Sequence, residues 1–166
     1  MKYSSQQLGK ILKKTEDELN SVMVNEFHSK AYVCSVNEDP ATCRPEYDFI
    51  AVQKLKDELA CKVRKIKHAL NAFNISTVVP GFDMTVDQIL IYIPQLSKLK
   101  SLYGDMRTKL PKVRVVKTSQ IIDYEYINYD LKEVSAKYED VSELLSAAQI
   151  ALDKVNAAEV IEIDLG

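Results

Sequence analysis

Basic and aromatic side chains gather in the middle of the sequence in a pattern that could bind a phosphorylated ligand. Lysine and arginine neutralise phosphate oxygens and release counterions, and tyrosine rings stack on nucleobases. The residues that could form such a binding surface are Arg64, Lys65, Lys67, Arg107, Lys109, Lys112, Arg114, Tyr124 and Tyr126. A signalling nucleotide or a nucleic acid would fit this chemistry. No helix-turn-helix, RNA-binding or zinc-finger motif accompanies the basic residues, and the net charge of the chain is −2.

Charge is strongly segregated along the chain. Residues 61–118 hold eleven lysines and arginines and three acids, whereas residues 119–166 hold three lysines and eleven acids. Three interpretations stay open. Opposite charges line the flanks of helices packed within one chain, or they pair between the subunits of a homo-oligomer, or the basic segment binds phosphate.

Tyrosines are concentrated in the acidic segment from Asp123 to Asp130. Aromatic rings beside carboxylates can form a cage for a cationic or nucleobase ligand. The alternative is structural, with Tyr124 and Tyr126 facing the core from a strand while their hydroxyls reach water.

Residues that could carry catalysis or bind metal do not form a recognisable motif. The chain has two histidines, His28 and His68, and lacks HExxH, ExxH, GxSxG, GxxxxGK[ST] and GxGxxG patterns. Its three cysteines, Cys34, Cys43 and Cys61, are an odd number without CxxC spacing. Cys34 and Cys43 lie in one loop-like stretch and could meet in an oxidising setting, but we expect reduced thiols. We therefore predict no catalytic residue, no metal and no cofactor.

Composition indicates an ordinary globular protein of the cytoplasm. Hydrophobic residues make up 46% of the 166 residues, so a core can form. The first residues are polar and resemble no secretory signal, and the longest apolar runs, such as Ile89–Ile93, are too short to cross a bilayer. We predict a cytoplasmic protein without membrane contact.

Apolar residues recur at spacings of three and four in four segments, which predicts four helices. Their expected ranges are 5–30, 49–74, 85–107 and 130–158. In the second segment the apolar row from Val52 to Phe73 repeats over three heptads, which is typical of a coiled-coil seam. The loop after the first helix is marked by Asn37–Pro40.

Local signals refine these boundaries. Thr85 and Gln88 fit a capping box at the start of the third helix, and Asp130 fits the N-cap of the fourth. Pro94 should kink the third helix or limit it to a short first turn. Alternating β-branched and aromatic residues predict short strands at 112–117, 120–127 and 160–165.

These elements predict a mostly α protein: a single helical domain over residues 1–166, built as an elongated antiparallel four-helix bundle with long helices and a minor β-hairpin.

The segment Val63–Asn74, a basic helix ending in asparagine, resembles small uncharacterised bacterial helical proteins, some of which are named septicolysin-like. The similarity covers about the middle half of the chain. The resemblance implies a bacterial or prophage origin and a helical fold, and it supplies no catalytic residues.

We expect a non-enzymatic interaction protein that forms a homo-oligomer and also binds a further protein. The heptad-bearing helices motivate this hypothesis, because they have more apolar surface than one thin bundle covers. A binder of phosphorylated ligands is the first alternative, and an enzyme with an unrecognised site is the second.

Overall fold

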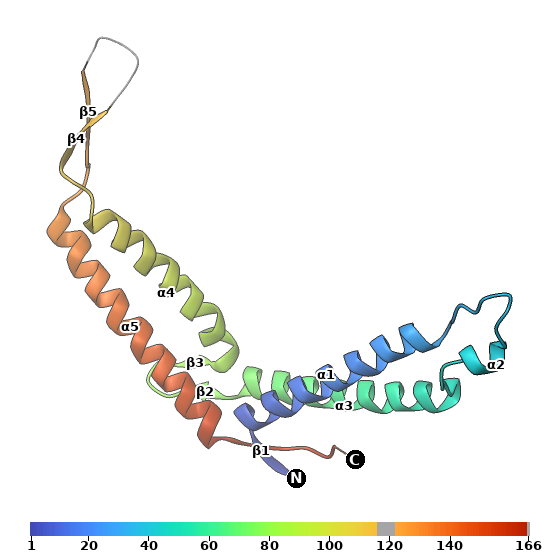
Figure 1. Ribbon diagram of the computed structural model, residues 1–166. Helices are drawn as coiled ribbons and strands as arrows, with labels where there is room; N and C mark the ends of the chain where they lie inside the picture. The colour runs from blue at the N-terminus through green and yellow to red at the C-terminus, as the bar shows by residue number, and fades with distance from the viewer. Residues whose placement is uncertain (116–121, 166) are drawn as a thin grey trace. The chain divides into compact units, whose positions relative to one another are not determined.

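The computed structural model describes residues 1–115 and 122–165 of the chain. The protein is mostly α with a minor β component, as the sequence predicts (Figure 1). The chain divides into two compact units, which are described separately. Unit 1 comprises Met1–Ser76 and Asn156–Gly166, and unit 2 comprises Thr77–Val155. That the whole chain forms a single domain stays a prediction.

Unit 1 is built on an antiparallel pair of long helices, α1 (Ser5–Ser29) and α3 (Phe49–Ser76) (Figure 1). The row of α1 at spacings of three and four, which includes Leu8, Thr15, Leu19 and Val22, is buried or half-buried, and Leu8 is completely buried. The predicted heptad seam of α3 is most deeply buried at Leu59, Ile66 and Phe73. Because both rows have the spacing of one helical face, the two helices enclose a single apolar seam.

The two ends of the chain meet in unit 1. Strand β1 (Lys2–Ser4) pairs antiparallel with β6 (Val160–Glu162), and Lys2 forms a 2.9 Å ion pair with Glu162. The sequence predicted a strand at 160–165 but no partner at the N-terminus. Ser4 also caps α1: its Oγ accepts from the amide of Gln7, whose side chain accepts from the amide of Ser4.

Between α1 and α3 the chain forms a loop with one short helical turn, α2 (Pro40–Cys43). The Asp39 carboxylate caps this turn by accepting a 2.9 Å hydrogen bond from the amide of Ala41. Pro40 favours the same geometry, because proline at the first helical position has a suitable φ and no amide to satisfy.

Unit 2 contains α4 (Val86–Arg107) and most of α5 (Leu131–Ala158), preceded by a short hairpin of β2 (Val78–Val79) and β3 (Met84–Thr85). Figure 1 shows α4 and α5 running antiparallel. Their seam is a cluster of buried aliphatic residues packed against half-buried aromatic and aliphatic ones. Its buried members are Leu96, Val141, Leu145 and Ala148, and Phe82, Tyr92, Ile93 and Tyr103 pack around them.

The predicted helix signals of unit 2 are confirmed, with one correction. Thr85 and Gln88 form the expected capping box, and the Asp130 carboxylate accepts a 2.6 Å hydrogen bond from the amide of Lys132. The expectation that Pro94 limits its helix to a short first turn is wrong, because α4 continues through Pro94 to Arg107. Proline removes one backbone hydrogen bond, and burial of Ile89 and Leu96 on either side offsets that loss.

A second hairpin joins α4 to α5. Strand β4 (Lys112–Val115) pairs antiparallel with β5 (Asp123–Tyr126), which confirms most of the described part of the predicted strands. Of the other predicted strand positions, Ile122 and Ile127 lie outside the strands, and 116–117 and 120–121 lie outside the described residues. The interpretation that Tyr124 and Tyr126 face a core is wrong, since their side chains are 46% and 61% exposed. Alternation identified the strands but could not show whether a core lay beside them.

None of the described helices is both long enough and apolar enough to cross a membrane.

Truncating a seam residue should destabilise unit 1 far more than truncating an exposed residue of the same helix. Ile66 is 0% exposed and Ile75 is 67% exposed, and both lie on α3. We expect Ile66→Ala to lower the free energy of unfolding by about 2–5 kcal/mol, because it removes buried methyl groups and leaves a cavity. Ile75→Ala should change it by less than about 0.5 kcal/mol. Urea unfolding followed by circular dichroism measures both, and equal losses would contradict the assigned seam.

Candidate functional site

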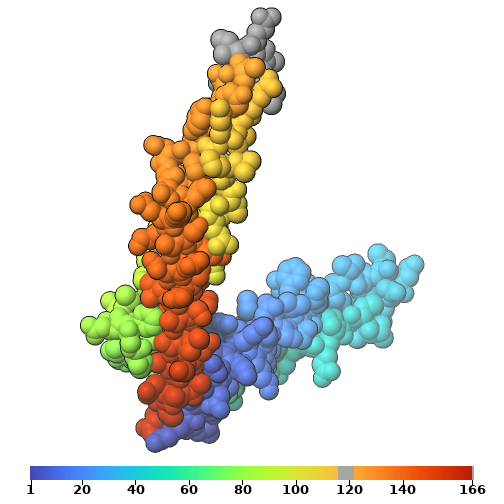
Figure 2. Space-filling view, turned by 90° about the vertical axis from the view of Figure 1, so that its left-hand side faces the viewer, coloured from blue at the N-terminus to red at the C-terminus, as the bar shows by residue number. Residues whose placement is uncertain are grey.

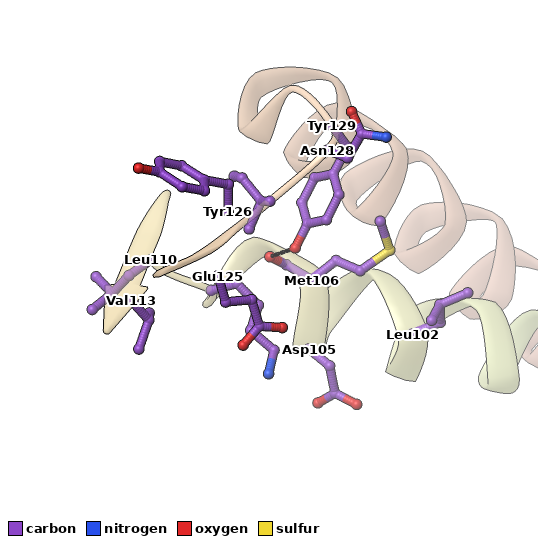
Figure 3. A pocket seen from close by; sticks show the side chains of 11 residues that line it. Leu102, Asp105, Met106, Leu110, Val113, Glu125, Tyr126, Asn128 and Tyr129 are labelled. Atoms are coloured by element: carbon purple, nitrogen blue, oxygen red, sulfur yellow. Dashed lines mark hydrogen bonds between the residues drawn. The ribbon is translucent and has the colours of Figure 1, made fainter. Parts of the chain in front are cut away.

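The C-terminal end of α4 and the base of the β4–β5 hairpin enclose an open hollow of about 550 Å³ within unit 2 (Figure 3). Its lining is mainly apolar, with charged side chains among it. The lining residues are Leu102, Asp105, Met106, Lys109, Leu110, Val113, Glu125, Tyr126, Ile127, Asn128 and Tyr129. We call this hollow, together with strands β4 and β5, the hairpin face.

Hydrogen bonds from the segment after β5 hold one wall of the hollow in place. The Tyr129 hydroxyl donates a 2.9 Å hydrogen bond to the carbonyl oxygen of Met106, as Figure 3 shows. The amide of Ile127 donates to the carbonyl of Pro111 at 3.3 Å. The Met106 carbonyl also accepts from the amide of Lys109 at 3.2 Å, so the Tyr129 hydroxyl is an additional partner at the end of α4, where the last carbonyls lack intrahelical bonds.

The lining of the hollow combines apolar side chains with a few polar ones. It holds no histidine, cysteine or serine. Its charged groups are Asp105, Lys109 and Glu125, and Figure 3 shows the Asp105 carboxylate pointing to a different side from the Tyr126 ring. Apolar walls with a few charges of both signs are typical of a surface that receives a side chain or a peptide segment.

The predicted binding residues of unit 2 lie on and around the hairpin face. Lys109 and Tyr126 line the hollow itself, whereas Arg114 and Tyr124 are opposite each other in the strand register. The ammonium of Lys112 lies 4.0 Å from the centre of the Tyr124 ring and 5.4 Å from that of Tyr126. The tyrosines therefore already have a cation from the same chain over their rings, which weakens the idea of a cage for a cationic ligand.

The other basic residues have different surroundings. The Arg107 guanidinium stacks over the ring of Tyr138 on α5, with its carbon 3.8 Å from the ring centre. Lys100 lies 5.8 Å from the centre of the same ring. In unit 2, Lys100 and Arg107 of the basic segment thus contact the acidic segment at the ring of Tyr138. Spacing along the sequence does not reveal this contact.

Arg64, Lys65 and Lys67 lie on α3 in unit 1. Lys67 forms a 2.7 Å ion pair with Glu16 of α1. Lys65 borders a hollow of about 510 Å³ that also has Glu18 and Glu58 in its lining. The predicted basic patch therefore divides between the two units, and Lys65 and Lys67 of unit 1 have acids beside them.

The loop between α1 and α3 brings three potential metal ligands together. The sulfur atoms of Cys34 and Cys43 and a carboxylate oxygen of Glu38 all lie within 4.8 Å of one another, and both thiols are free. A hydrogen bond with Cys43, together with partial burial, raises the pKa of the Cys34 thiol. The amide of Ser35, and then the Cys43 thiol, lower the pKa of Glu38. The sequence indicated that Cys34 and Cys43 could meet, but not that Glu38 joins them, because only closely spaced cysteine and histidine motifs were considered.

A polar network ties the end of the same loop to the helix pair. Glu26 of α1 accepts hydrogen bonds from Lys56 at 2.6 Å, Gln53 at 2.5 Å and the Tyr47 hydroxyl at 3.0 Å. The Glu26 and Lys56 side chains are only 15% and 25% exposed. The hydrogen bond from Lys56 is the largest cause that holds the pKa of Glu26 below its usual value, and desolvation partly opposes it.

This network should make unit 1 less stable in acid. A carboxylate whose pKa is lowered by folding contributes stability above its unfolded pKa and loses it as pH falls through the folded pKa. We therefore expect Glu26→Gln to be less stable than the wild type at neutral pH and to lose less stability on acidification. Urea unfolding from neutral pH down to pH values below the usual glutamate pKa measures this. Glu58→Gln, at an exposed acid of α3, is the control; parallel curves for the wild type and Glu26→Gln would contradict the assignment.

The fold defines a class of mostly helical protein with small antiparallel strand pairs. No family model matches the chain, and no curated protein matches it. The chain is similar in structure to a functionally unknown conserved protein from Corynebacterium diphtheriae, known from a crystal structure, with a TM-score of 0.64 and 13% sequence identity. The similarity covers 98% of this chain and 100% of that one. At this identity it shows the fold alone, so the septicolysin-like resemblance stays a prediction.

Proposed function

We propose that this is a non-enzymatic, self-associating helical interaction protein whose hairpin face binds a second copy of the chain. The observation that carries the proposal is the exposure of hairpin β4–β5 on both of its sides. Lys112, Val113 and Arg114 of β4 are exposed, and so are Tyr124, Glu125 and Tyr126 of β5.

A two-stranded hairpin that is exposed on both faces is not stabilised by packing against other elements. Two strands alone are marginally stable in water unless a further strand or a helix covers one face. Among the described residues, β4 and β5 pair with no third strand, so the outer edges along Lys112–Arg114 and Tyr124–Tyr126 have no further strand beside them. Unpaired edges readily accept another strand, and the apolar parts of Val113 and Tyr126 would be covered in the same step.

The surroundings of the hairpin extend this apolar surface. Leu110 is 66% exposed and Leu102 is 51% exposed, and both line the hollow beside the hairpin. Contiguous apolar residues with a polar rim are a usual mark of a protein interface.

The rim charges favour a second copy as the partner. In a twofold interface the same patch of both copies meets, so if one residue of the first copy contacts a second residue of the other copy, the reverse contact forms as well. Lys109 of one copy could then face Asp105 or Glu125 of the other, because the rim holds both signs. The segregation of basic residues into 61–118 and acidic residues into 119–166 would support such pairing along a larger part of the chain.

A cytoplasmic location and a bacterial or prophage origin belong to the same proposal, on the sequence arguments given above. Binding of phosphorylated ligands and an enzyme activity stay alternatives. The division of the basic patch between units and the Lys67–Glu16 ion pair lend the phosphate alternative no support.

Self-association should be visible in the mass of the protein in solution. We expect size-exclusion chromatography with light scattering to give a mass above the 18.8 kDa of one chain. Leu110→Lys with Val113→Lys should shift the protein toward the monomer, because four introduced charges would oppose each other across a twofold interface. Both positions are exposed, so the helices should stay folded by circular dichroism.

Ile150→Lys is the matched control, since Ile150 is 52% exposed on α5 and does not line the hollow. It should leave the mass unchanged. A wild type that is strictly monomeric at tens of micromolar would overturn self-association. An oligomer that survives the double substitution would overturn the assignment to the hairpin face.

A further inference from the structure

We propose that Cys34, Glu38 and Cys43 form a binding site for a thiophilic divalent cation of the zinc type. The site lies in the loop between α1 and α3 and does not depend on the proposed self-association. It would use two thiolates and one carboxylate as protein ligands and would leave a fourth position to water or to an external ligand.

The spacing of the ligand atoms matches what zinc requires. Zinc–sulfur distances of about 2.3 Å and zinc–oxygen distances of about 2.0 Å place a sulfur and an oxygen ligand about 3.5 Å apart in a tetrahedron. The Cys43 sulfur and the Glu38 Oε2 atom lie 3.6 Å apart. The three ligand atoms are all within 4.8 Å of one another, so the Cys34 sulfur needs only a small side-chain movement to reach the tetrahedral sulfur–sulfur spacing of about 3.8 Å.

The backbone around the cluster already orients its ligands. The amide of Ser35 donates a 3.1 Å hydrogen bond to Glu38 Oε2, and the amide of Glu38 donates to the carbonyl of Ser35 at 3.0 Å. Metal-bound carboxylates are commonly held by such a second hydrogen bond, which fixes their direction. Cys43 is fixed separately, because it ends the α2 turn that Asp39 caps.

On metal binding, each thiol would exchange its hydrogen bonds for a sulfur–metal bond. The Cys34 thiol donates to the carbonyl oxygens of Ser35 and Glu38 at 3.6 and 3.5 Å, and the Cys43 thiol donates to Glu38. Each thiol would release its proton to solvent as its sulfur–metal bond forms, and no oxidation takes place. Both cysteines are half-buried and Glu38 is exposed, so an ion can enter from water.

Two thiolates select the kind of ion. Soft sulfur ligands favour zinc and related metals over magnesium and calcium, which prefer oxygen alone. Three protein ligands with an open position differ from the closed four-ligand sets of structural zinc sites.

The test uses the reduced full-length protein and Zn²⁺ in competition with a chromophoric chelator. Co²⁺ serves as a second probe, because thiolate ligation gives a sulfur-to-cobalt charge-transfer band. We expect one ion per chain, and a band that is lost in the Cys34→Ala/Cys43→Ala variant. Glu38→Gln should weaken binding by roughly tenfold or more, on the scale seen when metal sites lose supporting groups.

Cys61→Ala is the matched control, since Cys61 is a free, half-buried thiol on α3 outside the cluster. It should bind like the wild type. The proposal is overturned if the double cysteine variant binds Zn²⁺ as tightly as the wild type, or if binding requires Cys61. Unchanged affinity in Glu38→Gln would remove the carboxylate from the ligand set and contradict the three-ligand site.

Discussion

Two paired helices can bury only the side on which each faces the other, and this constraint governs both units of the protein. In unit 1 the seam between α1 and α3 encloses Leu8, Leu59 and Ile66. In unit 2 the seam between α4 and α5 encloses Leu96 and Leu145. Each seam orders a long hairpin of helices, and each leaves the opposite faces of its helices without cover within the unit. Groups available for binding are therefore expected on the uncovered helix faces and on the connections between the helices.

The connections between paired helices carry the chemically distinctive groups. In unit 1 the connection holds Cys34, Glu38 and Cys43, and the Glu26 network fixes its return into α3. In unit 2 the connection is the β4–β5 hairpin, whose strands have exposed residues on both sides. Loops set on rigid elements commonly carry binding functions, because the scaffold tolerates variation in them. The two proposals concern these two connections and stand independently of each other.

Sequence reasoning predicted what depends on neighbours within a few residues. The apolar spacing gave four helices close to those observed, and the Thr85–Gln88 capping box was read correctly, because hydrogen bonding within one turn depends on local residues alone. The pairing of β1 with β6 was missed because it joins opposite ends of the chain. The stacking of Arg107 on Tyr138 and the convergence of the loop cysteines with Glu38 also depend on how the backbone folds back, which spacing does not reveal.

Self-association, as proposed, places a second copy of the chain over the hairpin face. Amide hydrogen exchange, followed by mass spectrometry over a range of protein concentrations, tests it directly, since exchange reports hydrogen bonding and exclusion of water at single segments. We expect amide exchange in Lys112–Val115 and Asp123–Tyr126 to slow as the protein concentration rises, while exchange in the seam of α1 and α3 stays constant. Exchange in both strands that is independent of concentration, in a protein that remains folded, would contradict it.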